Sequence, residues 1–451
     1  MLQDTSEAPL DIGVIGTGIS GLAAAWLLSQ RHRVTLYESE RRPGGHSHTV
    51  TVDHNGAETP VDTGFIVYNE HTYPNLTALF RLLEVPTQPT EMSFSVSLDD
   101  GALEYSGSGL SGLFAQRRNL IGPRFWSMLR DLRRFYAEGP RDLDELPPEM
   151  PLGDYLDRGG YGEAFRDDHL IPMGSAIWSA SGRSMADYPA ASFIRFFHNH
   201  GLLRFRDRPQ WRSVVGGSKV YVERLIAKSN ATLRLGTPIA RIMSDGASVQ
   251  LEDETGAVVR HDHVVVAAHA DQALGMLAPP SEEERRCLSA FRYSRNEAVL
   301  HSDPSAMPRR PAAWAAWNHI GRRNAAGDAP TMVTYWMNRL QQLDTRQPFF
   351  VSLNPEHEPD KVWHRQTFEH PIFDTSALNA QRALWSLQGR RRLWFCGAYF
   401  GAGFHEDGLQ AGLAVAEQLG GLRRPWDVPD ESGRIIVDPH HAETDRTELA
   451  A

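Results

Sequence analysis

The sequence predicts an α/β fold in which a parallel sheet binds a ligand at the carboxyl ends of its strands. An apolar strand over residues 12–15 runs into a glycine-rich turn, 16–21, and a helix rich in Ala and Leu follows over 22–30. A second strand, 34–37, then ends at Glu38. This order of strand, glycine turn, helix, strand and terminal acid is typical of a Rossmann-type unit that binds a dinucleotide.

Each small residue of the turn has a physical role in such a unit. Gly16 permits the tight turn, Gly18 lets the backbone approach a pyrophosphate, and Gly21 lets the helix pack closely on the strand. The amides at the start of the helix, where Ile19 and Ser20 lie, have no helical partners and face the phosphates. The sequence therefore predicts a phosphate site at this helix N-terminus.

The residues from Glu38 onward indicate which dinucleotide is bound. Glu38 can accept both hydrogen bonds of a ribose diol, and its charge disfavours a 2′-phosphate. The run that begins there resembles the E-x-x-x-x-x-G-G motif of flavoproteins with two dinucleotide-binding domains. The residues of this run that we assign to the cofactor are Glu38, Ser39, Arg42, Gly44, Gly45 and His46. The resemblance implies FAD, and the glycine pair with Arg42 would continue the phosphate cradle.

The segment 58–65 and two later blocks, the second block from Trp211 and the third from Leu393, resemble the flavin amine oxidase and phytoene desaturase superfamily in the same order along the chain. In that superfamily the first run usually ends in G-G-R, and here His46 takes the place of that Arg. A V-D-x-G segment then passes close to the flavin, a Val or Ile contacts the adenine, and a final strand, glycine-rich loop and helix receive the ribityl chain and the pyrimidine end of the flavin. The residues assigned to FAD in these blocks are Thr63, Gly64, Phe65, Ile239, Gly397, Asp407, Gly408 and Leu409.

The resemblance covers residues 10–420 and implies two domains that are both discontinuous in sequence. We expect an FAD-binding domain and an α+β substrate domain rich in aromatic side chains, followed by a polar tail that is poorly ordered. The expected ranges are 10–66, 212–290 and 386–421 for the FAD-binding domain, 67–211 and 291–385 for the substrate domain, and 422–451 for the tail.

The catalytic candidates lie in the third block. The amine oxidases of the superfamily usually carry a Lys in the substrate-domain strand after the second block, and residues 294–301 contain none. Phe404 stands where a Tyr is usual, and Tyr399 replaces an acid nearby. His405 lies in the same loop, where an imidazole near its normal pKa could move a proton, or where it could serve only as a structural hydrogen-bonding group. The position that links flavin covalently in some members holds no Cys, which favours noncovalent FAD.

More narrowly, several stretches resemble a bacterial subgroup of amine-oxidase-like proteins, often encoded beside methyltransferases similar to cyclopropane-fatty-acyl-phospholipid synthase. That resemblance implies an apolar, acyl-lipid substrate and a functional link to such a methyltransferase. We therefore expect an FAD-dependent oxidoreductase that oxidises or desaturates an apolar substrate. The alternatives are a flavin amine oxidase, a redox-neutral isomerase, and an FAD-binding partner of a lipid methyltransferase without turnover of its own.

The composition indicates which classes of partner the protein can bind and in which cellular compartment we expect it. The net charge of −10 disfavours nucleic acid, and no set of His, Cys or acidic residues has the spacing of a metal site. Two cysteines make no disulfide framework and the first ten residues are not a signal peptide, so we expect a cytoplasmic protein. A lipid substrate would add a peripheral contact with the inner membrane face, for which the candidates are Arg117 and Arg118, residues 130–135 and residues 193–197.

Overall fold

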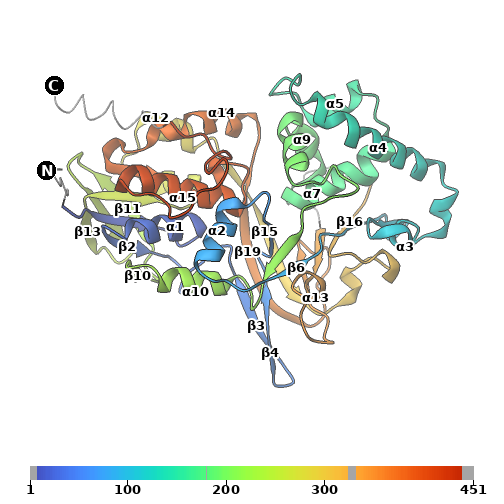
Figure 1. The fold of residues 1–451 in the computed structure, drawn as a ribbon, viewed down its shortest axis with the longest axis horizontal. Coiled ribbons are helices and arrows are strands. Elements are labelled where there is room, and N and C mark those ends of the chain that lie inside the picture. Colours follow the sequence, from blue (N-terminus) through green and yellow to red (C-terminus); the bar gives the residue numbers. More distant parts are fainter. Residues whose placement is uncertain (1–7, 179, 324–331, 439–451) are drawn as a thin grey trace.

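The computed structural model describes residues 8–178, 180–323 and 332–438, and it confirms the α/β fold. One half of the molecule contains a five-stranded sheet in the order β10-β2-β1-β14-β20, in which every pairing is parallel (Figure 1). Its strands are β1 (Asp11–Ile15), β2 (Arg33–Tyr37), β10 (Thr232–Arg234), β14 (His263–Val266) and β20 (Leu393–Phe395). They come from three separated parts of the chain, which are the three sequence blocks that resemble FAD-binding proteins.

Two helices cover this sheet and lie one over the other, α1 (Ile19–Leu28) and α15 (His405–Gly420) (Figure 1). Every residue of α1 is buried, because the helix lies between the sheet and α15. The two helices approach at Gly412, where an added Cβ would lie 2.2 Å from the carbonyl oxygen of Ser20. The apolar composition of α1 thus reflects burial on all sides.

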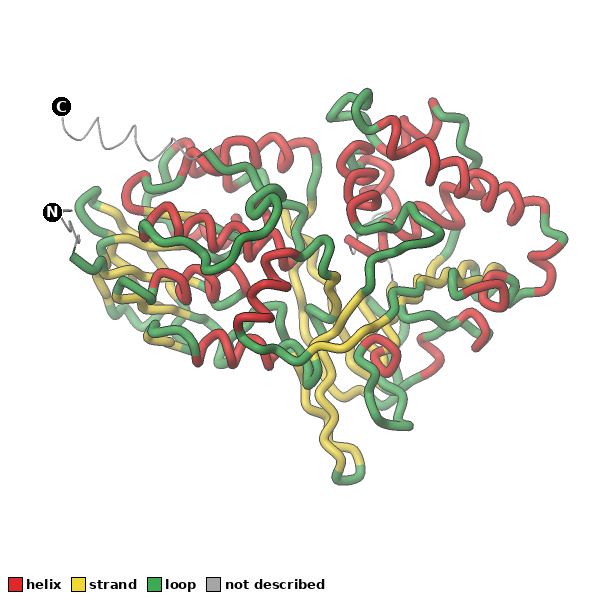
Figure 2. The backbone as a smooth tube through the Cα atoms, viewed as in Figure 1, coloured by secondary structure: helices red, strands yellow, loops and turns green. Residues whose placement is uncertain are grey.

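The other half contains a seven-stranded mixed sheet in the order β19-β15-β18-β17-β16-β7-β8, with helices gathered above it (Figure 2). Its strands are β7 (Phe94–Leu98), β8 (Leu103–Ser106), β15 (Arg292–His301), β16 (Trp317–Gly321), β17 (Met332–Trp336), β18 (Phe350–Leu353) and β19 (Val362–Ile372). Its helices are α3 (Gly109–Leu113), α4 (Pro123–Asp142), α5 (Leu152–Arg158), α6 (Glu163–Phe165), α7 (Ile171–Trp178), α8 (Gly182–Asp187), α9 (Ala190–Asn199) and α13 (Met337–Leu340). The long strands β15 and β19 run down the middle of the molecule, between the two halves.

Smaller sheets and helices complete the two halves. These strands are the hairpin β3 (Thr49–His54) and β4 (Ala57–Asp62), the sheet of β11 (Ile239–Ser244), β12 (Val249–Asp253) and β13 (Val258–His261), and the sheet of β5 (Val67–Asn69), β9 (Trp211–Val214) and β6 (Thr87–Thr90). The remaining helices are α2 (Pro74–Leu82), α10 (Lys219–Ala227), α11 (Ala270–Met276), α12 (Glu282–Leu288) and α14 (Thr375–Leu384).

Two helices do not follow the expected domain ranges. Helix α2 lies within 67–211 but packs against α15 of the parallel-sheet half. Helix α14 lies within 291–385 but packs against α12 of the same half. Both are amphipathic segments near a point where the chain passes from one expected domain to the other. The sequence pattern does not show in which of the two domains the apolar face of such a helix will be buried.

The expectation of a poorly ordered tail is wrong for residues 422–438; residues 439–451 lie outside the described part of the chain. The Arg424 side chain is completely buried and forms a bidentate pair with Glu417, with both N–O distances 2.8 Å. The indole of Trp426 stacks on Trp26 of α1, with ring centroids 5.9 Å apart. A polar, Pro-containing composition suggested disorder, but here the polar groups have specific partners on the parallel-sheet half.

The structure also shows whether the segments predicted to contact a membrane are buried or exposed. Phe193, Ile194, Phe196 and Phe197 are buried, so residues 193–197 belong to the core and that candidate is wrong. On α4 the buried side chains include Phe125, Met128 and Leu132. Across the described ranges, no helix is both long and apolar enough to cross a bilayer.

The pair between Arg424 and Glu417 supplies a test of the tail. Replacing Arg424 with Ala should lower the free energy of unfolding by about 3 kcal/mol, because it leaves Glu417 nearly buried without its partner. Thermal unfolding should show a lower Tm. The matched control is Arg423→Ala, whose side chain is 62% exposed, and it should cost less than about 1 kcal/mol. Equal melting of both variants and the parent protein would show that the tail does not stabilise the fold.

Candidate functional site

One cavity of about 750 Å³ runs between the two halves of the molecule. It begins at the carboxyl end of β2, passes the start of α1 and the loop before α15, and ends among aromatic side chains of the second half. Both β15 and β19 contribute to its wall through Tyr293, Phe368 and His370. The carboxyl ends of parallel strands are where α/β sheets bind ligands, so the cavity lies where the topology predicts it.

The first end of the cavity contains the residues predicted to contact the ribose and the adenine, Glu38 and Ile239. Glu38 follows β2, and Ile239, at the start of β11, lines the wall close by. The Glu38 carboxylate accepts hydrogen bonds from the Thr17 amide, at 3.0 Å, and from the Thr17 hydroxyl. The amide of Glu40 donates to its other oxygen at 2.9 Å. These bonds hold the carboxylate at the glycine turn, where a ribose diol would meet it.

The middle of the cavity is a backbone cradle. Gly16 has a φ of +99°, which side-chain-bearing residues rarely adopt, and it turns the chain from β1 into α1. A Cβ added at Gly18 would meet no described atom within 4 Å, so this backbone is open to the cavity. Gly45 has a φ of +55°, and a Cβ there would lie 3.1 Å from the Cα of Gly18. The start of α1 carries no acidic side chain and no side-chain cap, which leaves its amides free for an anion.

His405 also lines the cavity, and its surroundings are not those expected of a residue that carries a proton. Its Nε2 lies 3.0 Å from the Ser47 hydroxyl and 2.9 Å from the Tyr221 hydroxyl, and its ring stacks on Phe65 with centroids 3.8 Å apart. Burial lowers the pKa of His405 to about 3, so the imidazole is neutral at ordinary pH. The expectation of a near-normal pKa is therefore wrong, because the ring is removed from water and no acid in the described part of the chain raises its pKa.

The loop from Gly397 to Phe404 closes the cavity beside His405. The Tyr399 ring lies against Gly397, where a Cβ would come within 2.5 Å of the ring, and burial raises the pKa of Tyr399 far above its usual value. Within the described residues the Tyr399 hydroxyl has no hydrogen-bond partner. Phe404 stacks on Phe196 of α9, with centroids 4.7 Å apart, so this ring joins the loop to the aromatic end of the cavity.

Some predicted residues support the wall from behind. Asp407 is buried, accepts a hydrogen bond from the Phe404 amide at 2.8 Å, and pairs with Arg434 of the tail at 2.6 Å. Arg42 donates to the carbonyl oxygen of Gly45 at 3.0 Å.

The predicted residues that do not line the cavity are Gly21, Arg42, Gly44, Asp407, Gly408 and Leu409. The predicted residues that do line it are Gly16, Gly18, Ile19, Ser20, Glu38, Ser39, Gly45, His46, Thr63, Gly64, Phe65, Ile239, Gly397, Tyr399, Phe404 and His405.

A histidine group on the wall was not predicted as a group. His46 lies 6.3 Å from His269 and 5.5 Å from His370, measured between ring centroids. The amide of Asn296 lies 2.9 Å from Nδ1 of His370, and Nδ1 of His269 lies 3.4 Å from a carboxylate oxygen of Glu369. Burial lowers the pKa of His46 strongly and that of His370 to about 4. The imidazoles of His46 and His370 are therefore neutral.

The sequence held only a weak signal for this group. His269 lies three residues after the end of the apolar strand β14, near the edge where a parallel sheet presents ligand-facing residues. Glu369 and His370 lie on β19. They reach the cavity because β19 pairs with β15, a strand that is distant in sequence. No local motif marks such a pairing.

The second end of the cavity is an aromatic and aliphatic chamber. Short apolar side chains of α7 and β18 complete it. Its wall residues are Ile66, Val67, Met92, Phe94, Met173, Ala176, Ile177, Trp178, Phe196, Leu202, Trp211, Trp317, Tyr335, Leu353 and Phe368. Several of the aromatic side chains expected in the substrate domain thus line this chamber.

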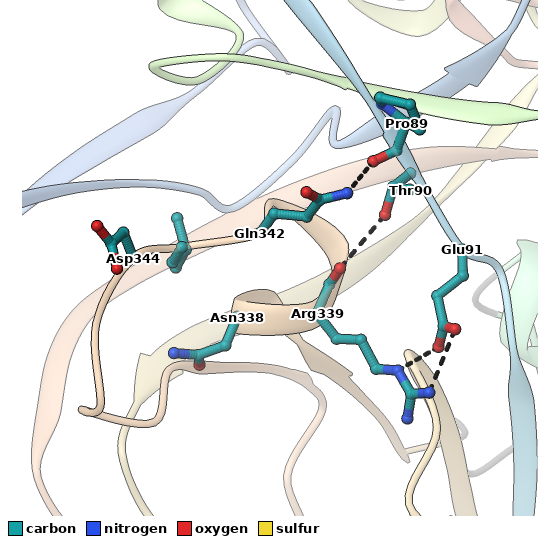
Figure 3. Close-up of a pocket in the computed structure, with 8 residues that line it drawn as sticks. Pro89, Thr90, Glu91, Asn338, Arg339, Gln342 and Asp344 are labelled. Carbon is teal, nitrogen blue, oxygen red and sulfur yellow. Dashed lines mark hydrogen bonds and ion pairs between the residues drawn. The ribbon is translucent and has the colours of Figure 1, made fainter.

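A second hollow of about 620 Å³ lies on the surface between residues 89–91 and 338–344 (Figure 3). Its polar groups bind one another. Arg339 forms an ion pair with Glu91, the Gln342 amide donates to the Pro89 carbonyl, and the Thr90 hydroxyl lies 3.4 Å from the Arg339 carbonyl (Figure 3). These bonds join α13 and the turn after it to β6 and to Glu91, which gives the hollow a structural role.

The long cavity fits FAD on its own geometry. The acid at the end of β2 suits a ribose, the open backbone at Gly18 and the free helix N-terminus suit a pyrophosphate, and the glycine-rich loop before α15 leaves room for a flat ring beside it. Neither Cys287 nor Cys396 lines the cavity, and both are buried. Neither cysteine is therefore placed on the cavity wall for a thioether link to the flavin.

Comparisons with known proteins agree with this geometry. The family model described as flavin containing amine oxidoreductase matches residues 19–299. Probable polyamine oxidase 4 of Arabidopsis thaliana is 31% identical over 155 residues, which span 34% of this chain and 29% of that protein. The aligned part thus covers less than a third of that relative.

Solved structures show the same fold at low sequence identity. Cyclohexylamine oxidase from Brevibacterium oxydans IH-35A superposes with a TM-score of 0.65 at 17% identity, covering 91% of this chain and 99% of that one. The CLA-producing fatty acid isomerase from P. acnes superposes with a TM-score of 0.61 at 15% identity, covering 90% and 97%. Because the family model matches more than half of the chain, the protein belongs to the flavin-containing amine oxidoreductase family, and its cofactor is FAD.

Proposed function

We propose that this FAD-dependent oxidoreductase oxidises or desaturates an apolar substrate of the acyl-lipid class in the aromatic chamber. The observation that carries the proposal is the charge of the cavity wall. Among the described residues that line it, none is Lys or Arg, and the two acids are Glu38 at the ribose end and Glu369. Glu369 lies near His269 and 3.8 Å from Arg295. The chamber itself therefore offers no carboxylate to a cationic amine.

The chain's own residues bind the substrate and remove its hydration shell. FAD supplies the redox chemistry when bound, because its flavin can accept a hydride from carbon. The chamber excludes water and binds methylene groups through apolar contact. Phe404 and Phe196 form a stacked wall between the loop and the chamber, and this wall orients a chain that enters it.

The histidine group supplies hydrogen bonds without charge. His370 accepts a hydrogen bond from Asn296 at Nδ1, so its proton lies on Nε2. With pKa values lowered by burial, His46 and His370 act as neutral donors and acceptors beside the cradle. Such groups can hold a polar carbonyl or hydroxyl of a substrate, whereas a charged group would demand a counterion.

The fatty acid isomerase relative supports one second candidate, a redox-neutral isomerisation of an acyl chain in the same chamber. Oxidation and isomerisation share the apolar binding site and differ in whether electrons leave the substrate. The two are separated by the redox state of the flavin at the end of the reaction.

The first test follows the flavin spectrum. Anaerobic mixing of the holoprotein with an acyl substrate should bleach the flavin absorbance near 450 nm as it is reduced, roughly in proportion to substrate oxidised. Polyamines and cyclohexylamine should leave the spectrum unchanged. Mass spectrometry of the lipid should show the loss of two hydrogens or the gain of one oxygen.

Three other results would contradict the proposal in different ways. Bleaching by amines alone would establish an amine oxidase. Transient bleaching with unchanged substrate mass would establish an isomerase. A flavin that keeps its redox state with every acyl lipid and amine would favour an FAD-binding partner without turnover.

The second test places a charge in the chamber. Ile177→Glu introduces a carboxylate at a wall position of α7, and burial of that unpaired charge beside an acyl chain should lower kcat/KM for the acyl substrate at least about tenfold. The matched control Ile177→Leu should change kcat/KM little, and FAD content should be the same in both variants. An acyl activity that tolerates Ile177→Glu would place the substrate elsewhere.

The third test concerns Glu38. Replacing it with Ala removes two charge-assisted hydrogen bonds to the ribose, each worth roughly 1.5–3 kcal/mol before water compensates. FAD affinity, measured by equilibrium dialysis, should fall by about tenfold or more. Glu58→Ala removes the same charge from the exposed β3–β4 hairpin and should leave affinity unchanged. Unchanged FAD retention in the Glu38 variant would show that Glu38 does not bind the ribose.

A further inference from the structure

A cluster of exposed apolar side chains lies at α3, the 3₁₀ helix η1 (Arg117–Leu120) and the start of α4. We call it the tip patch, and it consists of Leu110, Arg117, Arg118, Leu120, Ile121 and Trp126. The exposed fractions are 75% for Leu110, 50% for Leu120, 84% for Ile121 and 50% for Trp126. The Trp126 indole donates to the Leu120 carbonyl oxygen at 2.8 Å, and the Trp126 ring lies 6.1 Å from that of Phe114, the residue that follows α3. Exposed apolar clusters of this kind mark interaction sites.

The charge around the patch is opposite to that of the whole protein. The 26 residues from 105 to 130 contain no Asp or Glu and four arginines, in a chain with a net charge of −10. Arg124 pairs with Asp168, and Arg130 lies 3.4 Å from Asp131. Arg117 and Arg118 are exposed, and the described residues offer neither of them an acidic partner. Two unneutralised cations therefore flank the apolar side chains.

The patch is also placed where a flat surface could reach it. Helix α3 and the start of α4 lie at one end of the long axis, opposite the described ends of the chain (Figure 1). Beneath the patch, Phe114 lies 6.1 Å from both Phe125 and Trp126. Phe94 packs against the same core cluster and lines the chamber. A layer of apolar side chains thus separates the patch from the cavity.

We infer that the tip patch docks the protein on an anionic lipid surface, with Leu110, Ile121 and Trp126 inserted among the headgroups. Apolar side chains beside arginines, with a Trp whose indole nitrogen is already bonded, are the chemistry of an interfacial membrane contact. The charge favours anionic lipid, because Arg117 and Arg118 would gain from a negative surface. A protein partner could also cover apolar side chains, but the absence of acids from residues 105–130 favours the anionic surface. This inference stands without the proposed function, since it concerns docking and not turnover.

The test uses the FAD-loaded full chain and sedimentation with vesicles. We expect it to sediment with vesicles of equal parts phosphatidylglycerol and phosphatidylcholine, less with phosphatidylcholine alone, and less as salt is raised. Leu110→Asp combined with Ile121→Asp should weaken binding about tenfold or more. Arg117→Gln combined with Arg118→Gln should weaken it by a similar factor on anionic vesicles and little on neutral ones.

Matched controls alter the same chemistry elsewhere. Val258→Asp changes another exposed apolar residue, 54% exposed on β13, and Arg81→Gln with Arg286→Gln removes two exposed charges away from the patch. These controls should bind vesicles as the parent does. All variants should keep their FAD and their Tm, because the replaced side chains are exposed.

Two results would overturn the inference. One is a holoprotein that ignores anionic vesicles, or whose binding falls equally in the controls and the patch variants. The other is self-association in analytical ultracentrifugation that the Leu110→Asp and Ile121→Asp changes abolish, without vesicle binding. That result would assign the patch to a second copy of this chain.

Discussion

The structure depends on how closely helix α1 approaches its neighbours. A Cβ at Gly21 would lie 1.9 Å from the carbonyl oxygen of Gly16, and a Cβ at Gly412 would lie 2.2 Å from that of Ser20. Without side chains at these points, α1 packs against the turn that precedes it and against α15. The start of α1 and the loop before α15 thereby meet at the cavity, so one helix contact positions both the backbone cradle and that loop.

Residues close together in sequence were predictable, and residues brought together by the fold were not. The turn from Gly16 to Gly21 and the acid at Glu38 follow from local backbone needs, so one sequence stretch fixes them. Glu369 and His370 reach the cavity through a long-range strand pairing that has no local signature. Asp407 was assigned to the cofactor from its place in the third block, but its partner Arg434 lies in a segment expected to be disordered.

The tail shows why composition misled there. Polar and charged residues predict disorder when their groups are better solvated by water than by protein. Here Arg424 is fully buried against Glu417, and Arg434 reaches Asp407 at the start of α15. Each ion pair joins the tail to α15, the helix that follows the loop from Gly397 to Phe404. The tail thus supports the site indirectly, through a contact that composition alone cannot reveal.

Burial has two effects in the cavity, and both underlie the apolar substrate that we propose. Removing the wall from water makes the chamber attractive to methylene groups. The same loss of water lowers the pKa values of His46, His370 and His405, so these imidazoles carry no charge when substrate enters. A cationic amine would enter a chamber with no carboxylate of its own and beside neutral rings, and it would lose its hydration without gaining a counterion. An acyl chain has no such cost, because the fold that shields the flavin site also provides the apolar surroundings such a chain needs.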